Sequence, residues 1–90
     1  MTKAIPSVDP KTRLSVTAHA QDNVATLLDG KVDCATISGG LTIAKGVPFG
    51  HKVALRSISL GEAIVKYGVV IGHAYEAIGA GEHVHVHNIR

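Results

Sequence analysis

The second half of the chain contains two copies of one short sequence pattern. Residues 54–67 (ALRSISLGEAIVKY) align without gaps on residues 74–87 (AYEAIGAGEHVHVH), an offset of 20 residues. Each copy reads as a short turn, an inserted isoleucine, a Gly-Glu bend and a strand. Two copies are too few for a solenoid, which needs at least three stacked units. The repeat therefore predicts a pseudo-symmetric β-domain in which two related halves pack together.

Composition also favours strands over helices. The 90-residue chain has ten glycines and a hydrophobic content of 46%, but no Trp, one Phe and two Tyr. Aliphatic side chains must therefore form the core, and a chain of this length supports one modest core. No long segment has a helical period. We expect a single, mainly β domain with only short helical turns.

Two segments in the first half have specific patterns. Residues 14–18 (LSVTA) alternate apolar and polar side chains, which predicts a strand that faces the core through Leu14, Val16 and Ala18. In residues 21–30 (QDNVATLLDG), Asp22 or Asn23 can cap a short helical turn that Gly30 ends.

Prolines and glycines set the expected boundaries. Pro6 and Pro10 obstruct regular structure, so residues 1–12 are expected to form a flexible arm and residues 13–90 the domain. Residues 31–49 read as irregular strand material that glycines and a proline interrupt.

Charge and cysteine content exclude several classes of protein. The formal charge of +2 comes from scattered Lys and Arg, without a basic cluster or aromatic platform, so nucleic-acid binding is not expected. The single cysteine, Cys34, excludes an internal disulfide and a multi-cysteine zinc site, and reads as a core thiol. The first residues lack a signal-peptide pattern, and no apolar run approaches the roughly 18 residues of a membrane span. We expect a soluble cytoplasmic protein with no membrane partner.

The C-terminal segment EHVHVHNIR (82–90) contains three histidines that alternate with valines. In a strand, alternate residues point to the same side, so the imidazoles would share one face. The equivalent residues in the first repeat copy are Ala63, Val65 and Tyr67, so folding does not require histidine there. Two interpretations remain open: a histidine site, or a solvated polar surface.

The spacing of these histidines suits metal binding by neighbours. Adjacent same-face residues lie about 6.8 Å apart, so two imidazoles can converge on one cation. His83 and His87 would be about 13 Å apart and could share an ion only if the strand curved strongly. A two-histidine site needs further ligands, which favours a metal completed by another chain or by substrate. Imidazole suits Zn, Fe, Cu and Ni alike.

Other polar residues offer fewer constraints. His51, Lys52 and Lys66 are candidates for binding a substrate carboxylate, although isolated lysines are commonly solvated. His19 and His73 have no companions and are expected to be structural. No catalytic triad order, P-loop or GxGxxG pattern is present. Because acids and bases are few, we expect the chain to need a partner for catalysis.

Five motifs in this order resemble the small domain of the altronate dehydratase family: DNVA (22–25), GHKVAL (50–55), KYG (66–68), IG (71–72) and GEHVHVHN (81–88). Galactarate dehydratases and sulfolactate sulfo-lyases are close relatives within it. The resemblance runs from about residue 14 to the C-terminus, and residues 31–47 show no family motif. It implies a compact SAF-type β-clip domain, which occurs fused ahead of a large catalytic region or as a separate small subunit. The length of this chain resembles the separate form.

The resemblance also implies a function. It implies a lyase that eliminates water or sulfite from a 2-hydroxy acid, commonly a sugar acid, to give a 2-keto acid. Removing a proton beside a carboxylate is difficult, and a divalent metal, expected to be iron(II), would act as a Lewis acid. The implied metal ligands are His85, His87 and His83. The implied substrate contacts are His51, Lys66, Asn88, Asp22 and Asn23.

The general base is expected on a large catalytic subunit, so this chain alone should be inactive. Two alternatives stay open. In the first, the chain is a non-catalytic sugar-acid-binding or regulatory module, which would bind ligand without a large subunit. It can also be a purely structural subunit, which would bind neither metal nor ligand. In isolation it can form a homo-oligomer.

Overall fold

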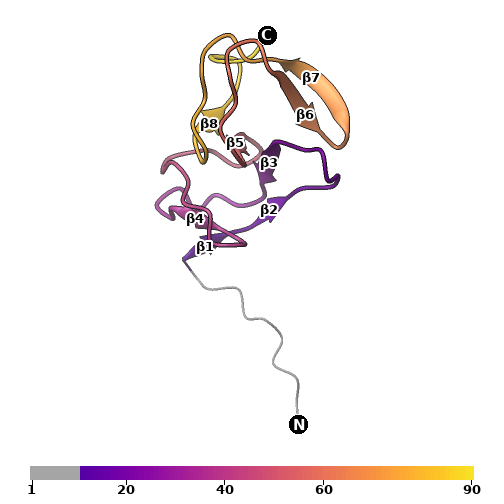
Figure 1. Ribbon diagram of the computed structural model, residues 1–90. Helices are drawn as coiled ribbons and strands as arrows, with labels where there is room; N and C mark the ends of the chain where they lie inside the picture. The colour runs from indigo at the N-terminus through magenta and orange to yellow at the C-terminus, as the bar shows by residue number, and fades with distance from the viewer. Residues whose placement is uncertain (1–10) are drawn as a thin grey trace.

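The computed structural model describes residues 11–90, in which short strands are joined by turns and no helix occurs (Figure 1). The predicted mainly β fold is therefore confirmed. No helix in this range is long and apolar enough to cross a bilayer. Most of the predicted arm lies outside the described residues, but Thr12 already belongs to the first strand. The strands are β1 (Thr12–Arg13), β2 (Ser15–Val16), β3 (Val24–Leu27), β4 (Thr36–Ile37), β5 (Lys52–Ala54), β6 (Ala63–Lys66), β7 (Val69–His73) and β8 (His83–Val84).

A four-stranded antiparallel sheet, in the order β2-β3-β5-β8, forms the centre of the molecule. Strands β1 and β4 form a parallel pair at one end, and the antiparallel β6-β7 hairpin lies at the other end (Figure 1). The sheet thus joins the first half of the chain to the C-terminal segment, because β5 pairs with β3 on one side and with β8 on the other.

The core consists of two aliphatic clusters. Alternate residues of β3 and β5 enter different clusters, since a strand points successive side chains to opposite faces. Cys34 is a half-buried thiol rather than a fully buried core residue. One cluster contains Val24, Ala54, Ile58, Ile64, Ala74, Ile78 and Val84, and the other contains Ala25, Leu27, Ile37, Ile43, Val47 and Val53.

The predicted repeat is confirmed by equivalent hydrogen bonds between its copies. The Ile58 amide donates to the Ile78 carbonyl at 2.8 Å, and the Ile78 amide donates back at 2.9 Å. The amides of Gly61 and Gly81 bond the alanine carbonyl that begins the other copy, at 2.6 and 2.7 Å. The strand that ends each copy pairs with the strand that leads into the other copy: β6 with β7, and β8 with β5.

The Gly-Glu bends have the structural role that their turn chemistry suggests. The Glu62 carboxylate accepts a hydrogen bond from the Ser59 amide, and the Glu82 carboxylate accepts one from the Gly79 amide, both at 2.9 Å. The glycines before these glutamates have φ of 84° and 82°, which glycine adopts readily. Each glutamate therefore closes the turn that begins its strand.

The predicted helical turn in residues 21–30 is wrong. Residues Val24–Leu27 form β3, and all four are buried. A short apolar run fits a fully buried strand as well as a helical turn, and periodicity alone does not separate the two. Packing favours the strand here, because alternate residues of β3 enter the two core clusters on opposite faces of the central sheet.

The predicted orientation of residues 14–18 is also wrong. Leu14 is 46% exposed, and the preceding Arg13 is fully buried instead. The Arg13 guanidinium bonds the Asp29 carboxylate at 3.0 Å and the Asp29 carbonyl at 2.6 Å. A buried arginine is tolerated where its donors are paired. Alternation of apolar and polar residues cannot reveal such a partner.

Replacing Thr26 with Val is expected to stabilise the protein. The Thr26 hydroxyl is buried, and it has no hydrogen-bond partner among the described residues. Leaving such a group unpaired costs about 1–3 kcal/mol, so removing the hydroxyl should recover about 1 kcal/mol. For a domain of this size, the melting temperature should rise by roughly 4–8 °C. A thermal melt measures this change, and a lower melting temperature would contradict the assignment of an unpaired hydroxyl.

Candidate metal centre

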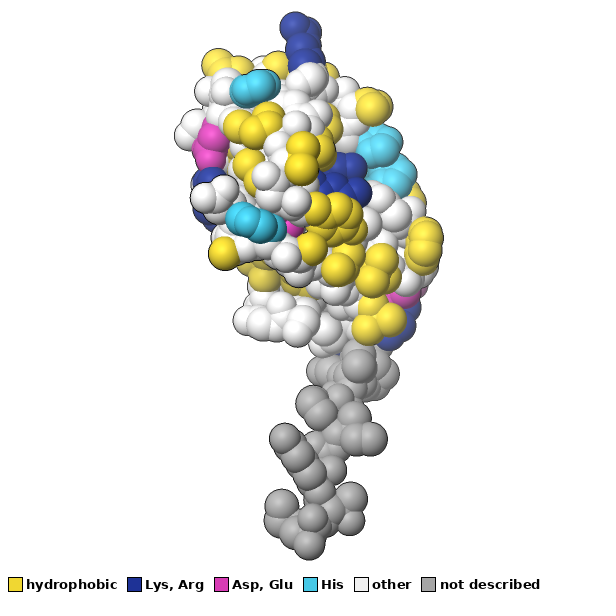
Figure 2. Space-filling view, turned by 90° about the vertical axis from the view of Figure 1, so that its right-hand side faces the viewer, with side chains coloured by type: hydrophobic (Ala, Val, Ile, Leu, Met, Phe, Trp, Pro, Cys, Tyr) yellow, Lys and Arg dark blue, Asp and Glu magenta, His cyan; other side chains and the backbone are white. Residues whose placement is uncertain are grey.

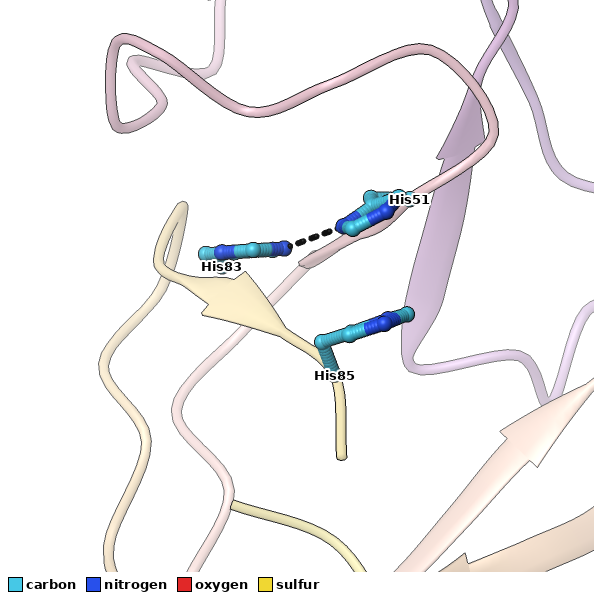
Figure 3. A group of neighbouring side chains, drawn as sticks. All are labelled: His51, His83 and His85. Carbon is cyan, nitrogen blue, oxygen red and sulfur yellow. Dashed lines mark hydrogen bonds between the residues drawn. The ribbon is translucent and has the colours of Figure 1, made fainter. Parts of the chain in front are cut away.

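Three histidine side chains meet where β5 pairs with β8. His51 directly precedes β5, His83 lies in β8, and His85 follows β8 (Figure 3). In the register of the two strands, His83 is opposite Val53. The antiparallel pairing thus brings His51 beside two residues that are more than 30 positions away in the chain. We call His51, His83 and His85 the histidine triad.

The triad has the spacing of a metal site. The three candidate ligand nitrogens all lie within 4.8 Å of one another, and all three residues are half-buried. Nδ1 of His51 and Nε2 of His83 are 2.9 Å apart, so one ring donates a hydrogen bond to the other. The rings of His51 and His85 stack at 3.9 Å between centroids. Since zinc–nitrogen bonds measure about 2.0–2.1 Å, two nitrogens on one such ion lie at most about 4.2 Å apart, so the side chains would have to reorient and move closer to hold it.

Burial and neighbouring charges favour the neutral form of two of these imidazoles. Burial lowers the pKa of His83 to about 4, and the charges of His87 and His51 act in the same direction. Burial also lowers the pKa of His85, followed by the charge of His51. Neutral imidazole is the form that binds metal ions, because protonation occupies the ligand nitrogen. The donor set is therefore suited to a cation.

His87 lies beside the triad but outside it. Strand β8 ends at Val84, and residues 86–88 form a turn, so the extended strand expected for 83–87 does not continue. The turn brings the His87 ring to 5.1 Å from the His83 ring, between centroids, with a tilt of 52°. The predicted metal ligands His83 and His85 thus come together with His51, which had been expected to bind substrate. His87 is a neighbour rather than a member of the cluster.

Asn88 holds this turn in place. Its side-chain oxygen accepts a hydrogen bond from the His85 amide at 2.9 Å, and its side-chain nitrogen donates to the His83 carbonyl at 2.8 Å. The side chain is buried, with 3% of the residue exposed. Asn88 therefore positions the backbone that carries two members of the triad.

Asn23 makes the equivalent contacts in the first repeat copy. It donates to the Ala63 carbonyl and accepts from the Val65 amide, both at 2.8 Å. Ala63 and Val65 correspond to His83 and His85 in the repeat. Sequence reasoning missed this equivalence, because Asn23 precedes the first copy whereas Asn88 follows the second. The same kind of asparagine bridge thus supports a histidine-free strand and a histidine-bearing one.

Asp22 has its carboxylate occupied by the backbone. It accepts hydrogen bonds from the amides of Ala18 and His19 at 3.1 Å and of Gly68 at 2.8 Å. Burial raises the pKa of this carboxyl, but the hydrogen bonds together outweigh burial and leave the pKa below its ordinary value. Asp22 therefore ties the loop before β3 to the β6-β7 turn.

Three other candidate residues, Lys66, His19 and His73, do not belong to the triad. Lys66 is in β6, with its ammonium group 5.0 Å from the centroid of the Tyr67 ring. His19 accepts a hydrogen bond from the Gln21 amide in a turn, and the backbone of His73 pairs with that of Arg90. Neither His19 nor His73 joins the triad.

Comparison with known proteins identifies relatives of this domain. Residues 13–90 match the family described as the altronate/galactarate dehydratase SAF domain. The chain is 43% identical over 75 residues to an altronate dehydratase of Escherichia coli (strain K12), covering 80% of this chain and 15% of the relative. It is 39% identical over 72 residues to the galactarate dehydratase (L-threo-forming) of the same organism, covering 78% and 14%. It is 44% identical over 48 residues to the (2R)-sulfolactate sulfo-lyase subunit alpha of Chromohalobacter salexigens, covering 53% and 51%.

These alignments differ in how much of the relative they cover. The chain spans about one seventh of the length of the two dehydratases. It spans about half of the subunit alpha.

Proposed function

The chain belongs to the altronate/galactarate dehydratase SAF-domain family, and from this premise we propose that it is the small subunit of a lyase. The enzyme would eliminate water or sulfite from a 2-hydroxy acid to give a 2-keto acid. Altronate, galactarate and sulfolactate, which the names of the relatives contain, define the class of substrate.

The observation that carries this proposal is the histidine triad. His51, His83 and His85 offer three nitrogens within 4.8 Å, and burial favours the neutral form of His83 and His85. These residues would hold a divalent ion, with iron(II) as the expected metal. When bound, such an ion supplies Lewis-acid stabilisation of the negative charge that develops beside the substrate carboxylate.

The other residues of the chain would orient the site. Asn88 fixes the turn that presents His83 and His85, so it acts on the metal through them. Lys66 would contact a carboxylate, and His87 lies close enough to the triad to contact bound substrate. The side chains of Asn23 and Asp22 form hydrogen bonds with backbone groups and would hold β6 and the β6-β7 turn in place.

The general base would come from the large catalytic subunit. Asp22, Asp29, Glu62 and Glu82 already accept hydrogen bonds from amides or from an arginine of this domain. A proton-abstracting group has to reach its substrate at about 2.6–3.2 Å, which an engaged structural carboxylate does not offer. The small fraction of the dehydratases that this chain covers is consistent with a catalytic region elsewhere.

We expect the purified chain to show no lyase activity, and to gain it when combined with the catalytic region of a family member. The reason is that the domain supplies candidate metal ligands, whereas the carboxylates of Asp22, Asp29, Glu62 and Glu82 are engaged in structural hydrogen bonds. The assay measures formation of 2-keto acid from altronate, galactarate and sulfolactate, with each component alone as control. Robust turnover by the chain alone would contradict the proposal that the general base lies on a large catalytic subunit. Activity of the catalytic region that does not change on adding the chain would favour a regulatory or structural module.

A further inference from the structure

The turn between β6 and β7 contains an unusual backbone conformation. Two residues, Tyr67 and Gly68, connect the strands, with φ of 55° and 75°. Positive φ at both central residues is the signature of a type I′ turn, in which Asn-Gly is a preferred pair. Within the described part of the chain, Tyr67 is the one residue other than glycine with positive φ. A bulky side chain in this conformation is strained, and such strain is often found at functional positions.

Neighbouring groups hold this turn in its conformation. The Asp22 carboxylate accepts a hydrogen bond from the Gly68 amide at 2.8 Å. The His19 ring lies so close to Gly68 that an added Cβ would be 3.0 Å from it. A strained conformation persists only where the surrounding structure enforces it. The loop before β3 therefore fixes the turn, and Tyr67 is presented at a defined place.

The Tyr67 side chain contacts the ammonium group of its neighbour. Nζ of Lys66 lies 5.0 Å from the centroid of the Tyr67 ring. Lys66 is half-buried, and Tyr67 is 48% exposed. A cation within about 6 Å of an aromatic face is attracted to it. Figure 2 shows the side of the molecule on which this turn lies, where hydrophobic side chains gather next to lysine or arginine side chains.

We propose that Tyr67 is a positioning residue, whose ring holds the Lys66 ammonium group in place for a carboxylate of the substrate. The role of Lys66 comes from the proposed function, on which this inference rests, and Tyr67 is added to it. Asparagine or glycine would fit the turn with less strain, but neither has a ring. Without the ring, the ammonium group would move freely on its flexible four-carbon stem. Tyr67 thus acts on the substrate through Lys66.

Two substitutions in the full chain separate the ring from the strain. Tyr67→Asn removes both, since asparagine tolerates the left-handed region, and its melting temperature should rise by roughly 4–8 °C. In NMR spectra of the wild type, the ring current of Tyr67 should shift the ε-protons of Lys66 upfield. These protons should return toward the position of a solvated lysine in Tyr67→Asn. Tyr67→Phe retains ring and strain, so it should match the wild type in both measurements.

The reconstituted enzyme provides the functional measurement. Tyr67→Asn should raise KM by about two- to fivefold, the range of one exposed cation–π contact, with kcat nearly unchanged. Tyr67→Phe should leave KM unchanged. In a Lys66→Met background, Tyr67→Asn should have no further effect on KM, because the ammonium group that the ring holds is gone.

The outcomes separate this inference from the proposed function. Unchanged KM in Tyr67→Asn, or an equal rise of KM in the Lys66→Met background, would overturn the positioning role. Equal ε-proton shifts of Lys66 in the wild type and Tyr67→Asn would overturn it too, and they are measured on the chain alone. A lower melting temperature in Tyr67→Asn would also overturn it, since Tyr67 would then contribute stability. If the reconstituted wild type has no turnover, the proposed function fails, and the proton shifts still decide whether Tyr67 holds Lys66.

Discussion

Replacing both His83 and His85 with Gln is expected to abolish stoichiometric binding of a divalent ion while leaving the fold intact. The two changes remove two of the three triad nitrogens, and glutamine is a far poorer metal ligand than imidazole. The fold should survive because Ala63 and Val65 occupy the equivalent repeat positions without any imidazole. In a reconstituted enzyme, turnover should fall by at least about 10²–10³-fold. Titration with cobalt(II) and the 2-keto acid assay measure the two effects.

Two controls sharpen this prediction. A double His19→Gln and His73→Gln variant carries the same number of changes outside the triad, and it should bind metal normally. His87→Gln should have a smaller effect than the triad variant, because His87 adjoins His83 without joining the cluster. If the His83/His85 variant bound one ion per chain with unchanged affinity, the triad would not be the metal site. The histidines would then form a solvated polar surface, as expected for a purely structural subunit.

Replacing Asn88 with Ala is expected to weaken metal binding by roughly 10–100-fold, the range typical of residues that orient metal ligands. The substitution frees the His83 carbonyl and the His85 amide, which Asn88 now bridges. Asn23→Ala is the matched control, because it breaks the same bridge in the histidine-free copy. Each variant should lose about 2–4 kcal/mol of stability, since two backbone groups lose their partner.

The comparison of these two variants separates positioning from stability. Both should melt at lower temperature, but only Asn88→Ala should lose cobalt(II) affinity. If Asn88→Ala does not fold, Asn88→Asp retains the acceptor for the His85 amide and removes the donor to the His83 carbonyl. That variant should fold and still bind cobalt(II) more weakly than the wild type. Equal loss of affinity in the Asn23 and Asn88 variants would mean that Asn88 contributes stability alone.

The repeat was the most informative feature of the sequence for the fold. Its offset of 20 residues identified the equivalent isoleucines and the two Gly-Glu bends, and Ile58 and Ile78 bond each other as related halves require. Local pattern was less reliable in the first half. The VATL segment reads equally as a helical turn, and its identity as β3 depends on the buried sheet that later strands complete. Arg13 is buried because Asp29 pairs with it, 16 residues away.

The candidate site was only partly predictable for a similar reason. The alternation of histidines indicated His83 and His85, which are near each other in any strand. His51 joins them through the pairing of β5 with β8, a long-range contact that residue spacing does not contain. His87 leaves the cluster because Asn88 turns the chain after β8. The bridging role of Asn23 was not predictable either, because it contacts Ala63 and Val65, 40 and 42 residues away, and nothing in the repeat marks it.

The most direct measurement of the central claim is the position of a bound ion. Crystals of the full chain grown with cobalt(II) would be measured at the absorption edge of the metal, so that anomalous scattering locates the ion. The account predicts one anomalous peak per chain at about 2.0–2.2 Å from nitrogens of His51, His83 and His85. A strong peak elsewhere on the domain, or no peak at cobalt(II) concentrations that saturate the protein in solution, would contradict it.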